Sequence, residues 1–440
     1  MRVSPRIYVI VQSIVAIVFL AIVPGHAATF NVIYDFCAKA SCTDGGTPLS
    51  EIFVDAAGHL FGTTAAGGTA NGGTFYELTR DTQTGKWKRT TLYNFCSKAN
   101  CTDGSSPLGR LIADASGNFY GVVYSNGAEG GNGVAYELSP GVRGKWKSKT
   151  LYTFCSKAQC TDGFGMAGGL TYKGVQSGLA YDGKSPLYGA TRFGGSVGQG
   201  IVYALTPARG TWTESIIHDF CTETESCDLH DGSNPAGELV IDADGNLFGA
   251  TEGGGPNFGG TLFQLSPDGA NWDETILHSF CDQTGCEEGN MPTGVVMNAA
   301  GDLLGSTQQS IGQEGTSGVT FKLAPNGDYS VSHKFCSLAD CADGMQPLSN
   351  VSIDAAGNLF GTAVSGGGND GDPNHGGGGV LFRITAAGKF KVLHSFCAMA
   401  NCADGAYPET SAVAGADGHL YGTTTIGGKF GKGVVYEIVP

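Results

Sequence analysis

Fourteen cysteines are the residues of this 440-residue chain whose spacing most clearly indicates chemistry. They form seven short pairs, six of the form C-x4-C and one, the fourth, of the form C-x5-C. The pairs are Cys37 with Cys42, Cys96 with Cys101, Cys155 with Cys160, Cys221 with Cys227, Cys281 with Cys286, Cys336 with Cys341 and Cys397 with Cys402. Such pairs could form disulfides, bind a metal or carry out thiol redox chemistry, and their arrangement in the fold decides between these.

The pairs belong to an internal repeat. Their first cysteines recur every 55 to 66 residues, and each unit holds four short strand-like segments. In the second unit, "RLIADASGNFYGVV" predicts two strands joined by a tight turn at residues 114–117, in which Gly117 supplies a positive φ. A glycine-rich loop then leads to the third strand, "VAYEL", and "GKWKSKTLYTFC" contains the fourth. No window shows a sustained helical period, so we expect almost no helix.

A four-stranded unit repeated seven times predicts an all-β fold, a seven-bladed β-propeller with four antiparallel strands per blade. The chain ends after a third strand, "GVVYEIVP", and its mature part begins with a fourth, "TFNVIYDFC". We therefore expect the N-terminal strand to complete the last blade and to close the ring. A linear solenoid, the alternative, would need distinct capping repeats. Residues 29–440 are expected to form this single domain from repeats of about 59 residues.

The ring decides the chemistry of the cysteines. Each pair falls in the connection between the fourth strand of one blade and the first strand of the next, so the pairs are spread around the axis. A zinc site needs four converging ligands, and a thioredoxin-like site uses C-x-x-C beside a helix. The sequence therefore predicts seven local disulfides, each closing a short loop and stabilising the fold by about 2 kcal/mol through chain entropy.

Other recurring residues occupy positions that predict packing. A glycine in each second strand indicates close approach of another backbone: Gly62, Gly121, Gly189, Gly249, Gly305, Gly361 and Gly422. Each third strand carries one matched aromatic: Tyr76, Tyr136, Tyr203, Phe263, Phe321, Phe382 and Tyr436. Four fourth strands open on Trp87, Trp146, Trp212 and Trp272, and we expect Tyr329 and Phe390 in that place in two others. Histidines replace Tyr34, Tyr93 and Tyr152 as structural substitutes in later units: His218, His278, His333 and His394.

An acidic residue follows the second cysteine of every unit: Asp44, Asp103, Asp162, Asp231, Glu288, Asp343 and Asp404. One interpretation is a turn in which the carboxylate caps the backbone beside a glycine. The other is a ring of carboxylates that binds a cation or sugar hydroxyls. In a propeller these loops share a face with the variable loops between second and third strands, and binding residues usually lie on such loops. We therefore expect this face to be the binding surface.

Three acids of the variable loops lie outside the repeat pattern: Glu129, Glu252 and Glu314. They are the candidates for catalysis by paired carboxylates. No Ser-His-Asp or Cys-His pairing can be assembled, because His59 and His419 take turn positions and His230 and His375 lie in irregular loops.

The sequence calls for no cofactor, and two motifs need separate interpretation. Asp370, Asp372 and Asn374 begin like a calcium loop, but an EF-hand would need glycine at His375 and glutamate at Leu381. A looser calcium site there is the metal hypothesis that remains. The segment "GLAYDGKS" (178–185) fits the phosphate-loop pattern, yet a proline and a strand follow it where that loop needs a helix. We interpret this match as coincidence.

The first residues indicate export. Arg2 and Arg6 precede the apolar run "IYVIVQSIVAIVFLAIV", and the small-residue stretch "GHAA" follows it. Residues 1–28 therefore predict a secretory signal peptide, with a retained membrane anchor as the alternative. Removal of both arginines changes the formal charge from -15 to -17. An acidic exported chain with no basic stripe is not suited to nucleic acid or to an anionic membrane surface.

Units such as "AAGHLFGTTAAGG…GGTFYEL" and "DGHLYGTTTIGGKFGKGVVYEI", each with its "DG…P" loop, resemble the GloVer tandem repeat family of exported bacterial proteins. The resemblance covers the mature chain, and the third and fifth units depart most from the pattern. It implies export and a repeat scaffold, and it brings no catalytic residues with it.

The function expected from the sequence is that of a secreted, monomeric binding scaffold without a membrane span after signal cleavage, located outside the cell or in the periplasm. Its expected ligand is a polysaccharide or an envelope protein. Two alternatives remain: a propeller hydrolase or lyase acting on extracellular polysaccharide, and a structural component of a surface layer or matrix.

Overall fold

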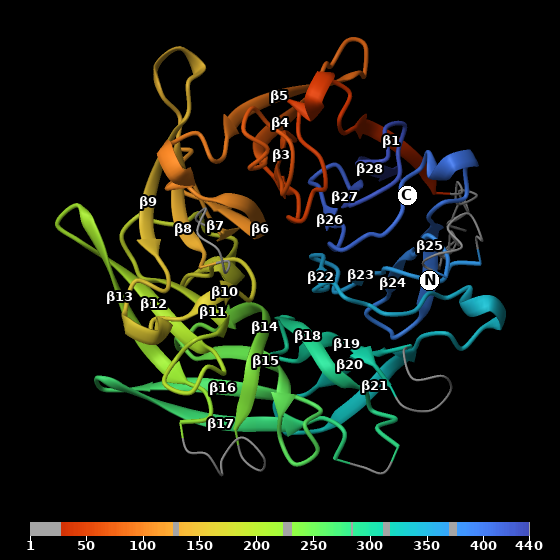
Figure 1. Ribbon diagram of the computed structural model, residues 1–440. Coiled ribbons are helices and arrows are strands. Elements are labelled where there is room, and N and C mark those ends of the chain that lie inside the picture. The colour runs from red at the N-terminus through yellow and green to blue at the C-terminus, as the bar shows by residue number, and fades with distance from the viewer. Residues whose placement is uncertain are drawn as a thin grey trace, which may run out of the picture.

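The computed structural model describes residues 28–125, 132–222, 231–282, 285–310, 317–368 and 376–439. The described chain forms 28 strands in seven antiparallel sheets of four, arranged like blades around one axis (Figure 1). Its helical elements are short 3-10 turns, with no α-helix in the described ranges. The predicted seven-bladed β-propeller is confirmed. The predicted signal peptide falls on residues 1–27, which lie outside the described residues, and on Ala28.

The first four blades run from the axis outwards in chain order. Blade 1 holds β2 (Phe53–Val54), β3 (Leu60–Thr64), β4 (Thr74–Arg80) and β5 (Trp87–Asn94). Blade 2 holds β6 (Ser105–Ala113), β7 (Phe119–Ser125), β8 (Val134–Ser139) and β9 (Lys147–Thr153). Blade 3 holds β10 (Phe164–Met166), β11 (Leu187–Phe193), β12 (Ile201–Ala208) and β13 (Thr211–Asp219). Blade 4 holds β14 (Gly232–Ile241), β15 (Leu247–Gly254), β16 (Thr261–Asp268) and β17 (Asn271–Ser279).

The last three blades complete the ring. Blade 5 holds β18 (Asn290–Met297), β19 (Leu303–Gln309), β20 (Val319–Leu323) and β21 (Tyr329–Lys334). Blade 6 holds β22 (Ser352–Ile353), β23 (Leu359–Ala363), β24 (Val380–Ile384) and β25 (Phe390–Ser395). Blade 7 holds β26 (Val413–Ala414), β27 (Leu420–Thr424), β28 (Val434–Val439) and β1 (Thr29–Asp35). The 3-10 turns are η1 (Ala40–Cys42), η2 (Ala99–Cys101), η3 (Val142–Gly144), η4 (Ala158–Cys160), η5 (Val175–Ser177), η6 (Ala339–Cys341) and η7 (Ala400–Cys402).

The N-terminal strand closes the ring as predicted. β1 pairs antiparallel with β28, with Thr29 opposite Val439 and Asp35 opposite Val434. Figure 1 shows the red start of the chain beside its blue end in one blade. The hydrogen bonds of β28 are thus satisfied on both sides, and the two ends of the chain lock the ring.

The recurring glycine of each second strand makes room for a ring. Gly62 lies opposite Tyr76 in the β3–β4 register, and a Cβ added at Gly62 would lie 2.5 Å from Tyr76 Oη. The same pairing occurs at the six other matched glycines. We expected another backbone to approach here, and this was wrong: it is the aromatic ring of the third strand that lies over the glycine.

The outermost strands form a belt of contacts between blades. Tyr329 and Phe390 do not take the place of the tryptophans, as we had expected, but lie two residues further along the strand. Tyr329 pairs with the third-strand Leu323, whereas Trp272 lies opposite Pro267, beyond the matched Leu265. From that position Tyr329 stacks on a histidine of the preceding blade. The stacked pairs are Tyr329 on His278, Phe390 on His333 and Phe30 on His394, with centroid separations of 4.1, 3.5 and 3.7 Å.

Six of the seven predicted disulfides lie in the described residues and are formed, each between the two cysteines of one pair. Of the fourth pair, Cys221 is described as disulfide-bonded, and Cys227 lies outside the described residues. The local pairing confirms one covalent link per described blade junction, which restrains the loop between neighbouring blades.

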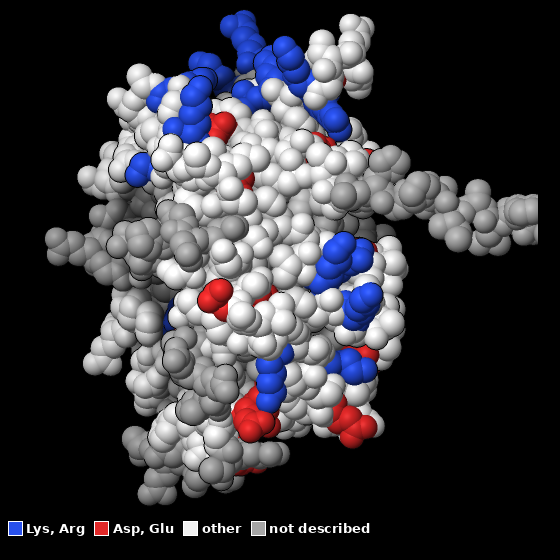
Figure 2. Space-filling model, turned by 90° about the vertical axis from the view of Figure 1, so that its right-hand side faces the viewer, with Lys and Arg blue, Asp and Glu red and all other residues white. Residues whose placement is uncertain are grey.

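Cations are distributed unevenly over this acidic chain. Figure 2 shows Lys and Arg gathered at the end of the molecule that lies at the top of Figure 1. The neighbouring blades 1 and 2 carry several exposed lysines near their outer edges: Lys86, Lys88, Lys145, Lys147 and Lys149. The linear sequence shows no basic stripe, because these residues come from two repeats that the fold brings side by side.

The third-strand tyrosines yield a prediction. The hydroxyl of Tyr136 is buried without a hydrogen-bond partner, and blades 4 to 6 carry phenylalanine at this position. Because an unpaired buried hydroxyl costs free energy, Tyr136→Phe should leave the free energy of unfolding unchanged or raise it by about 1 kcal/mol. The matched control, Tyr93→Phe, removes a 2.5 Å hydrogen bond to Asp103 and should lower it by about 1–2 kcal/mol. Urea denaturation of both variants measures this, and the reverse order would contradict the packing described.

Candidate functional site

The acidic residue of each inter-blade loop is bound within its own loop. Asp44 Oδ2 accepts hydrogen bonds from Tyr34 Oη (2.6 Å) and Ala38 N (2.9 Å), and Asp44 Oδ1 accepts one from Lys39 N (3.1 Å). Matched bonds to the fourth-strand Tyr or His and to the loop backbone occur at Asp103, Asp162, Asp343 and Asp404. All five side chains are fully buried. These carboxylates therefore act as caps, and they have no exposed surface to offer a ligand.

The other two members of the set are held differently. Asp231 is nearly buried and accepts hydrogen bonds from Cys221 N (2.6 Å) and Gly232 N (2.7 Å). Glu288 is half-buried, and its Oε1 accepts a bond from Asp282 N (2.9 Å). Each of the seven acids belongs to a different blade junction, so they surround the ring rather than form one site.

The hydrogen bonds decide how these carboxyl groups titrate. Burial alone would raise the pKa of Asp343, but the bonds from His333, Ser337 and Leu338 N outweigh it and lower the pKa to about 2. The pKa values of Asp103, Asp162 and Asp404 are lowered for the same reason. The ionised caps thus stabilise the folded loops.

The face that we expected to carry the binding surface has the predicted construction. The loops between second and third strands lie against the cysteine loops, as shown by the bonds from Gly68 N to Cys42 O (3.0 Å) and from Gly428 N to Cys402 O (2.8 Å). In the middle of this face a cavity of about 550 Å³ opens at the propeller axis. We call it the upper cavity.

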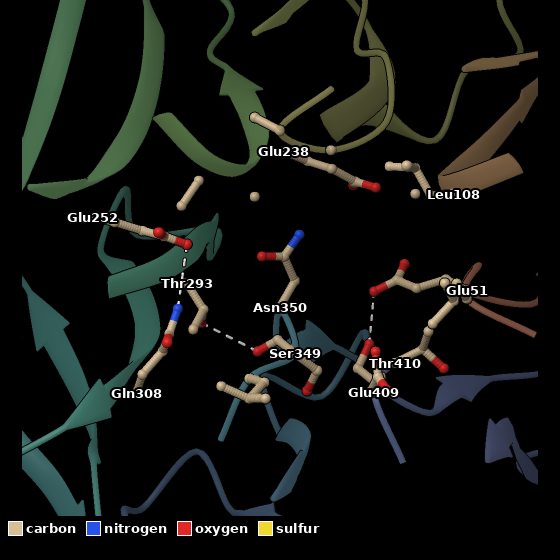
Figure 3. A pocket seen from close by; sticks show the side chains of 18 of the residues that line it. Glu51, Leu108, Glu238, Glu252, Thr293, Gln308, Ser349, Asn350, Glu409 and Thr410 are labelled. Atoms are coloured by element: carbon tan, nitrogen blue, oxygen red, sulfur yellow. Dashed lines mark hydrogen bonds between the residues drawn. The ribbon is translucent and has the colours of Figure 1, made fainter. Parts of the chain in front are cut away.

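The upper cavity is built from one short stretch of every repeat. Its walls are the residues that begin the innermost strands, together with Arg192, Glu252 and Gln308 from second strands (Figure 3). Six repeats have a proline just before this stretch: Pro48, Pro107, Pro235, Pro292, Pro347 and Pro408. The third residue after that point is, blade by blade, Glu51, Arg110, Gly169, Glu238, Val295, Asn350 and Ser411. The sevenfold pattern therefore breaks at the axis.

Five of these residues, Glu51, Arg110, Glu238, Asn350 and Ser411, form what we call the polar layer. Ser411 Oγ of blade 7 donates a hydrogen bond to Glu51 Oε1 of blade 1 at 2.7 Å. Arg110 of blade 2 pairs with Glu238 of blade 4, through Nε to Oε2 at 3.1 Å and backbone N to Oε1 at 2.6 Å. Blade 3 contributes glycine here, and a Cβ at Gly169 would lie 2.8 Å from Glu238 Oε1.

Asn350 reaches across the axis from blade 6. A Cβ added at Gly237 of blade 4 would lie 2.5 Å from Asn350 Oδ1, and one added at Gly294 of blade 5 would lie 2.1 Å from it. Asn350 Oδ1 is buried without a hydrogen-bond partner in the protein. Figure 3 shows the amide of Asn350 standing between the carboxylates of Glu51, Glu238 and Glu252. The polar layer thus spans the channel from three sides.

The polar layer separates two spaces. A second cavity of about 470 Å³ lies along the axis on the other side and is lined mainly by aliphatic residues of the innermost strands. Glu51, Glu238 and Asn350 line both cavities. A ligand that enters the upper cavity therefore meets polar side chains at its floor.

The acids of the upper cavity have altered proton affinities. Burial, reinforced by the charge of Glu238, raises the pKa of Glu51 to about 7, although Arg110 and Ser411 oppose this shift. Burial also raises the pKa values of Glu252 and Glu409. The charge of Glu238 is the main cause of the raised pKa of Arg110. The cavity thus combines an acid that holds a proton near neutral pH with a carboxylate that is paired with a guanidinium group.

Of the three proposed catalytic acids, Glu252 lies in the wall of the upper cavity. It pairs with Arg192, and its Oε1 accepts a hydrogen bond from Gln308 Nε2 at 3.3 Å. Glu129 and Glu314 lie outside the described residues, as do Asp370, Asp372 and Asn374 of the proposed calcium site. His230 and His375 also lie outside them.

A third cavity, of about 910 Å³, lies away from the upper face between blades 1 and 2 and the irregular segment around η5. Phe53, Phe119, Trp146 and Leu179 are among its mostly apolar lining residues. It exists because the third repeat departs from the pattern between β10 and β11. The phosphate-loop look-alike lies in this departure. Its Asp182 caps the backbone of Lys184 and Ser185, and strand β11 follows, which confirms that no phosphate loop forms.

Sequence reasoning missed most of the upper cavity. Glu51, Arg110, Glu238 and Asn350 look like ordinary strand residues when each repeat is read alone. A signal was available: when the repeats are aligned on the proline after the Asp-Gly loop, one nearby position changes from blade to blade while its neighbours recur. Such a position points to the axis, where the seven blades need not be equivalent.

Comparisons with known proteins agree with this architecture. The profile described as the Gloeobacter/Verrucomicrobia repeat matches residues 174–436, well over half of the chain. No curated protein matches the sequence. None of the helices in the described residues has the length or apolar character of a membrane span.

Solved structures share the fold at low sequence identity. The extracellular domain of a protein described as a one-component system from B. thetaiotaomicron is 10% identical, with a TM-score of 0.51 over 92% of this chain and 39% of that one. The alpha-L-arabinanase of Penicillium chrysogenum is 12% identical, with a TM-score of 0.44 over 76% and 93%. The sialidase of Trypanosoma rangeli is 9% identical, with a TM-score of 0.41 over 82% and 57%. At these identities the likeness shows the fold alone.

The buried caps give a pH prediction. Because the folded-state pKa of Asp343 lies below its ordinary value, its contribution to stability is complete above about pH 4 and is lost as the pH falls towards 2. Asp343→Asn should therefore lower the melting temperature at neutral pH, and the difference from wild type should shrink below about pH 4. Asp340→Asn, at an exposed position of the same loop, is the control and should change little. Circular dichroism melts across this range decide, and a difference of constant size down to pH 2 would rule out the assigned role.

Proposed function

We propose that this chain, which belongs to the Gloeobacter/Verrucomicrobia repeat family, is an exported propeller that binds an oligosaccharide in its upper cavity. The observation that carries the proposal is the break in sevenfold symmetry at the axis. Where an unconstrained scaffold could repeat one residue seven times, this chain places carboxylates, an amide, a guanidinium group and a hydroxyl around one cavity.

The chemistry of the walls suits a ligand with many hydroxyl groups. Besides the polar layer, the upper cavity is lined by Gln308, Thr293, Ser349 and Thr410, so donors and acceptors alternate around it. Its volume lies within the usual range for small-molecule sites, which is about 300–1,000 Å³. Room for one or two sugar residues follows from this size.

The expected mode of recognition is hydrogen bonding. Among the described residues that line the upper cavity there is no aromatic side chain on which a sugar ring could stack. The two arginines at the cavity are each paired with a glutamate, so neither offers an unpaired positive charge to an anionic ligand. These features favour neutral sugars over acidic ones.

Binding is tested first with a panel of neutral and uronic-acid oligosaccharides, by calorimetry on the purified chain. A neutral member of the panel should bind, and Asn350→Ala should weaken that binding about tenfold, which corresponds to one hydrogen bond. The control is Asn326→Ala, which changes an exposed asparagine in the turn between β20 and β21. Equal binding by both variants, or none by wild type, would argue against the cavity as a sugar site and favour an envelope protein or a structural role.

A second function, hydrolysis of polysaccharide, is favoured by one observation. Glycoside hydrolysis uses two carboxyl groups, one protonated and one ionised, and the environments of Glu51 and Glu238 differ in this sense. In this function Glu51 would protonate the leaving oxygen, while Glu238 would act as base or nucleophile.

The same panel tests this second function when reducing ends are measured after incubation. Hydrolysis predicts release of reducing ends by wild type, together with loss of turnover in Glu51→Gln while binding is retained. Glu409→Gln changes another cavity acid without touching the pair and is the matched control. Binding without any release of reducing ends by wild type would leave the binding function alone.

Export completes the proposal. Disulfides persist in oxidising compartments, and the described part of the chain forms them at every junction where both cysteines are described. Mass spectrometry of the exported protein should find seven linked peptides, each holding one pair, and a mature N-terminus near Ala28. Free thiols in the native protein would contradict export into an oxidising compartment.

A further inference from the structure

One blade junction departs from the contact belt of the outer strands. At three junctions, a Tyr or Phe of one blade stacks on the fourth-strand His of the blade before it. At the junction of blades 3 and 4 the matched residue is Glu274, which lies opposite the third-strand Leu265 as Tyr329 lies opposite Leu323. Here the histidine, His218, faces a carboxylate instead of an aromatic ring.

A second carboxylate meets the same imidazole. His218 Nε2 lies 3.4 Å from Asp231 Oδ1 and 3.4 Å from Glu274 Oε1. The three ligand atoms lie within 4.8 Å of one another, and this is the only such group of three His, Cys, Asp or Glu residues in the described part of the chain. The exposed fractions of the side chains are 19% for His218, 11% for Asp231 and 17% for Glu274.

The contacts within this group are poor for hydrogen bonding. At the junctions after blades 5 and 6, the histidine nitrogen lies 3.0 and 3.1 Å from its aspartate, within ordinary hydrogen-bond distance. His218 lies further from both of its carboxylates, and its Nε2 can give a proton to only one of them. Glu274 Oε1 is buried and has no hydrogen-bond partner. Two carboxylates and an incompletely used imidazole are thus held together away from water.

The distances agree with a tetrahedral metal. Zinc binds imidazole nitrogen and carboxylate oxygen at about 2.0–2.2 Å, so neighbouring ligand atoms of a tetrahedral site lie about 3.4 Å apart. Both distances from His218 Nε2 have this value. The backbone also orients one ligand, since Asp231 Oδ1 accepts a bond from Gly232 N and Asp231 Oδ2 one from Cys221 N.

We propose that His218, Asp231 and Glu274 bind one divalent transition metal ion, zinc, and so join blades 3 and 4. Three protein ligands leave the fourth tetrahedral position to water. The ion would balance the two carboxylates and take the place of the aromatic contact found at the other junctions. This proposal is independent of the upper cavity and of its function.

Zinc alone is the probe. Wild-type protein treated with a chelator and then given zinc chloride should take up one ion per chain in calorimetry and mass spectrometry of the eluted metal. Its melting temperature should rise by several degrees, since an ion that binds the folded state stabilises it. Cobalt(II) in place of zinc should give the visible absorption of a tetrahedral site.

Glu274→Tyr restores the residue type that blade 5 uses at Tyr329, so it should fold while losing the zinc-dependent rise in melting temperature. Glu214→Tyr makes the same change at the matched position of blade 3, where Glu214 pairs with Lys157, and should keep zinc uptake. Glu274→Gln, which keeps the shape of the side chain, should weaken zinc binding at least tenfold and replaces the tyrosine variant if that does not fold. Absence of one-to-one uptake by wild type, or unchanged uptake by both Glu274 variants, would overturn the proposal.

Discussion

Seven strands converge on one axis, and the shortage of space there is the constraint on which the rest of the structure depends. Glycine at positions 169, 237 and 294 lets blades 3, 4 and 5 come close enough for side chains of other blades to reach them. Because these blades contribute little volume, Arg110 can pair with Glu238 across blade 3, and Asn350 can cross from blade 6. The polar layer is therefore a result of unequal packing around an axis that the backbone makes nearly symmetrical.

The outer parts of the blades supply the rigidity that this unequal centre needs. A disulfide and a buried aspartate hold each well-described inter-blade loop, and the outermost strands contact one another through stacked rings or polar pairs. These devices repeat because each junction has the same task. The junction of blades 3 and 4 is the exception, since its ring is replaced by a carboxylate.

The two regions therefore evolve under different physical demands. A residue at a blade junction must fit the same neighbours in every copy, so its type repeats. A residue at the axis faces six different blades, and its type is free to differ from those of its counterparts. Binding or catalysis by a propeller needs such differences, which explains why the candidate site lies where the repeat is least regular. The face of variable loops is wide, but its centre is where side chains from all blades meet.

The sequence by itself determined the number of blades, the order of strands, the closure by the first strand and the local pairing of cysteines. These depend on contacts within one repeat or between successive repeats, and repetition made each of them visible seven times. It left the role of the acidic loop residues open between cap and ligand, because burial cannot be read from a motif. It also misplaced Tyr329 and Phe390, because strand register depends on the hairpin and not on residue type. Only the tertiary structure decided which residues share the axis. Glu51, Arg110, Glu238 and Asn350 are separated by many tens of residues, and only closure of the ring brings them to one cavity.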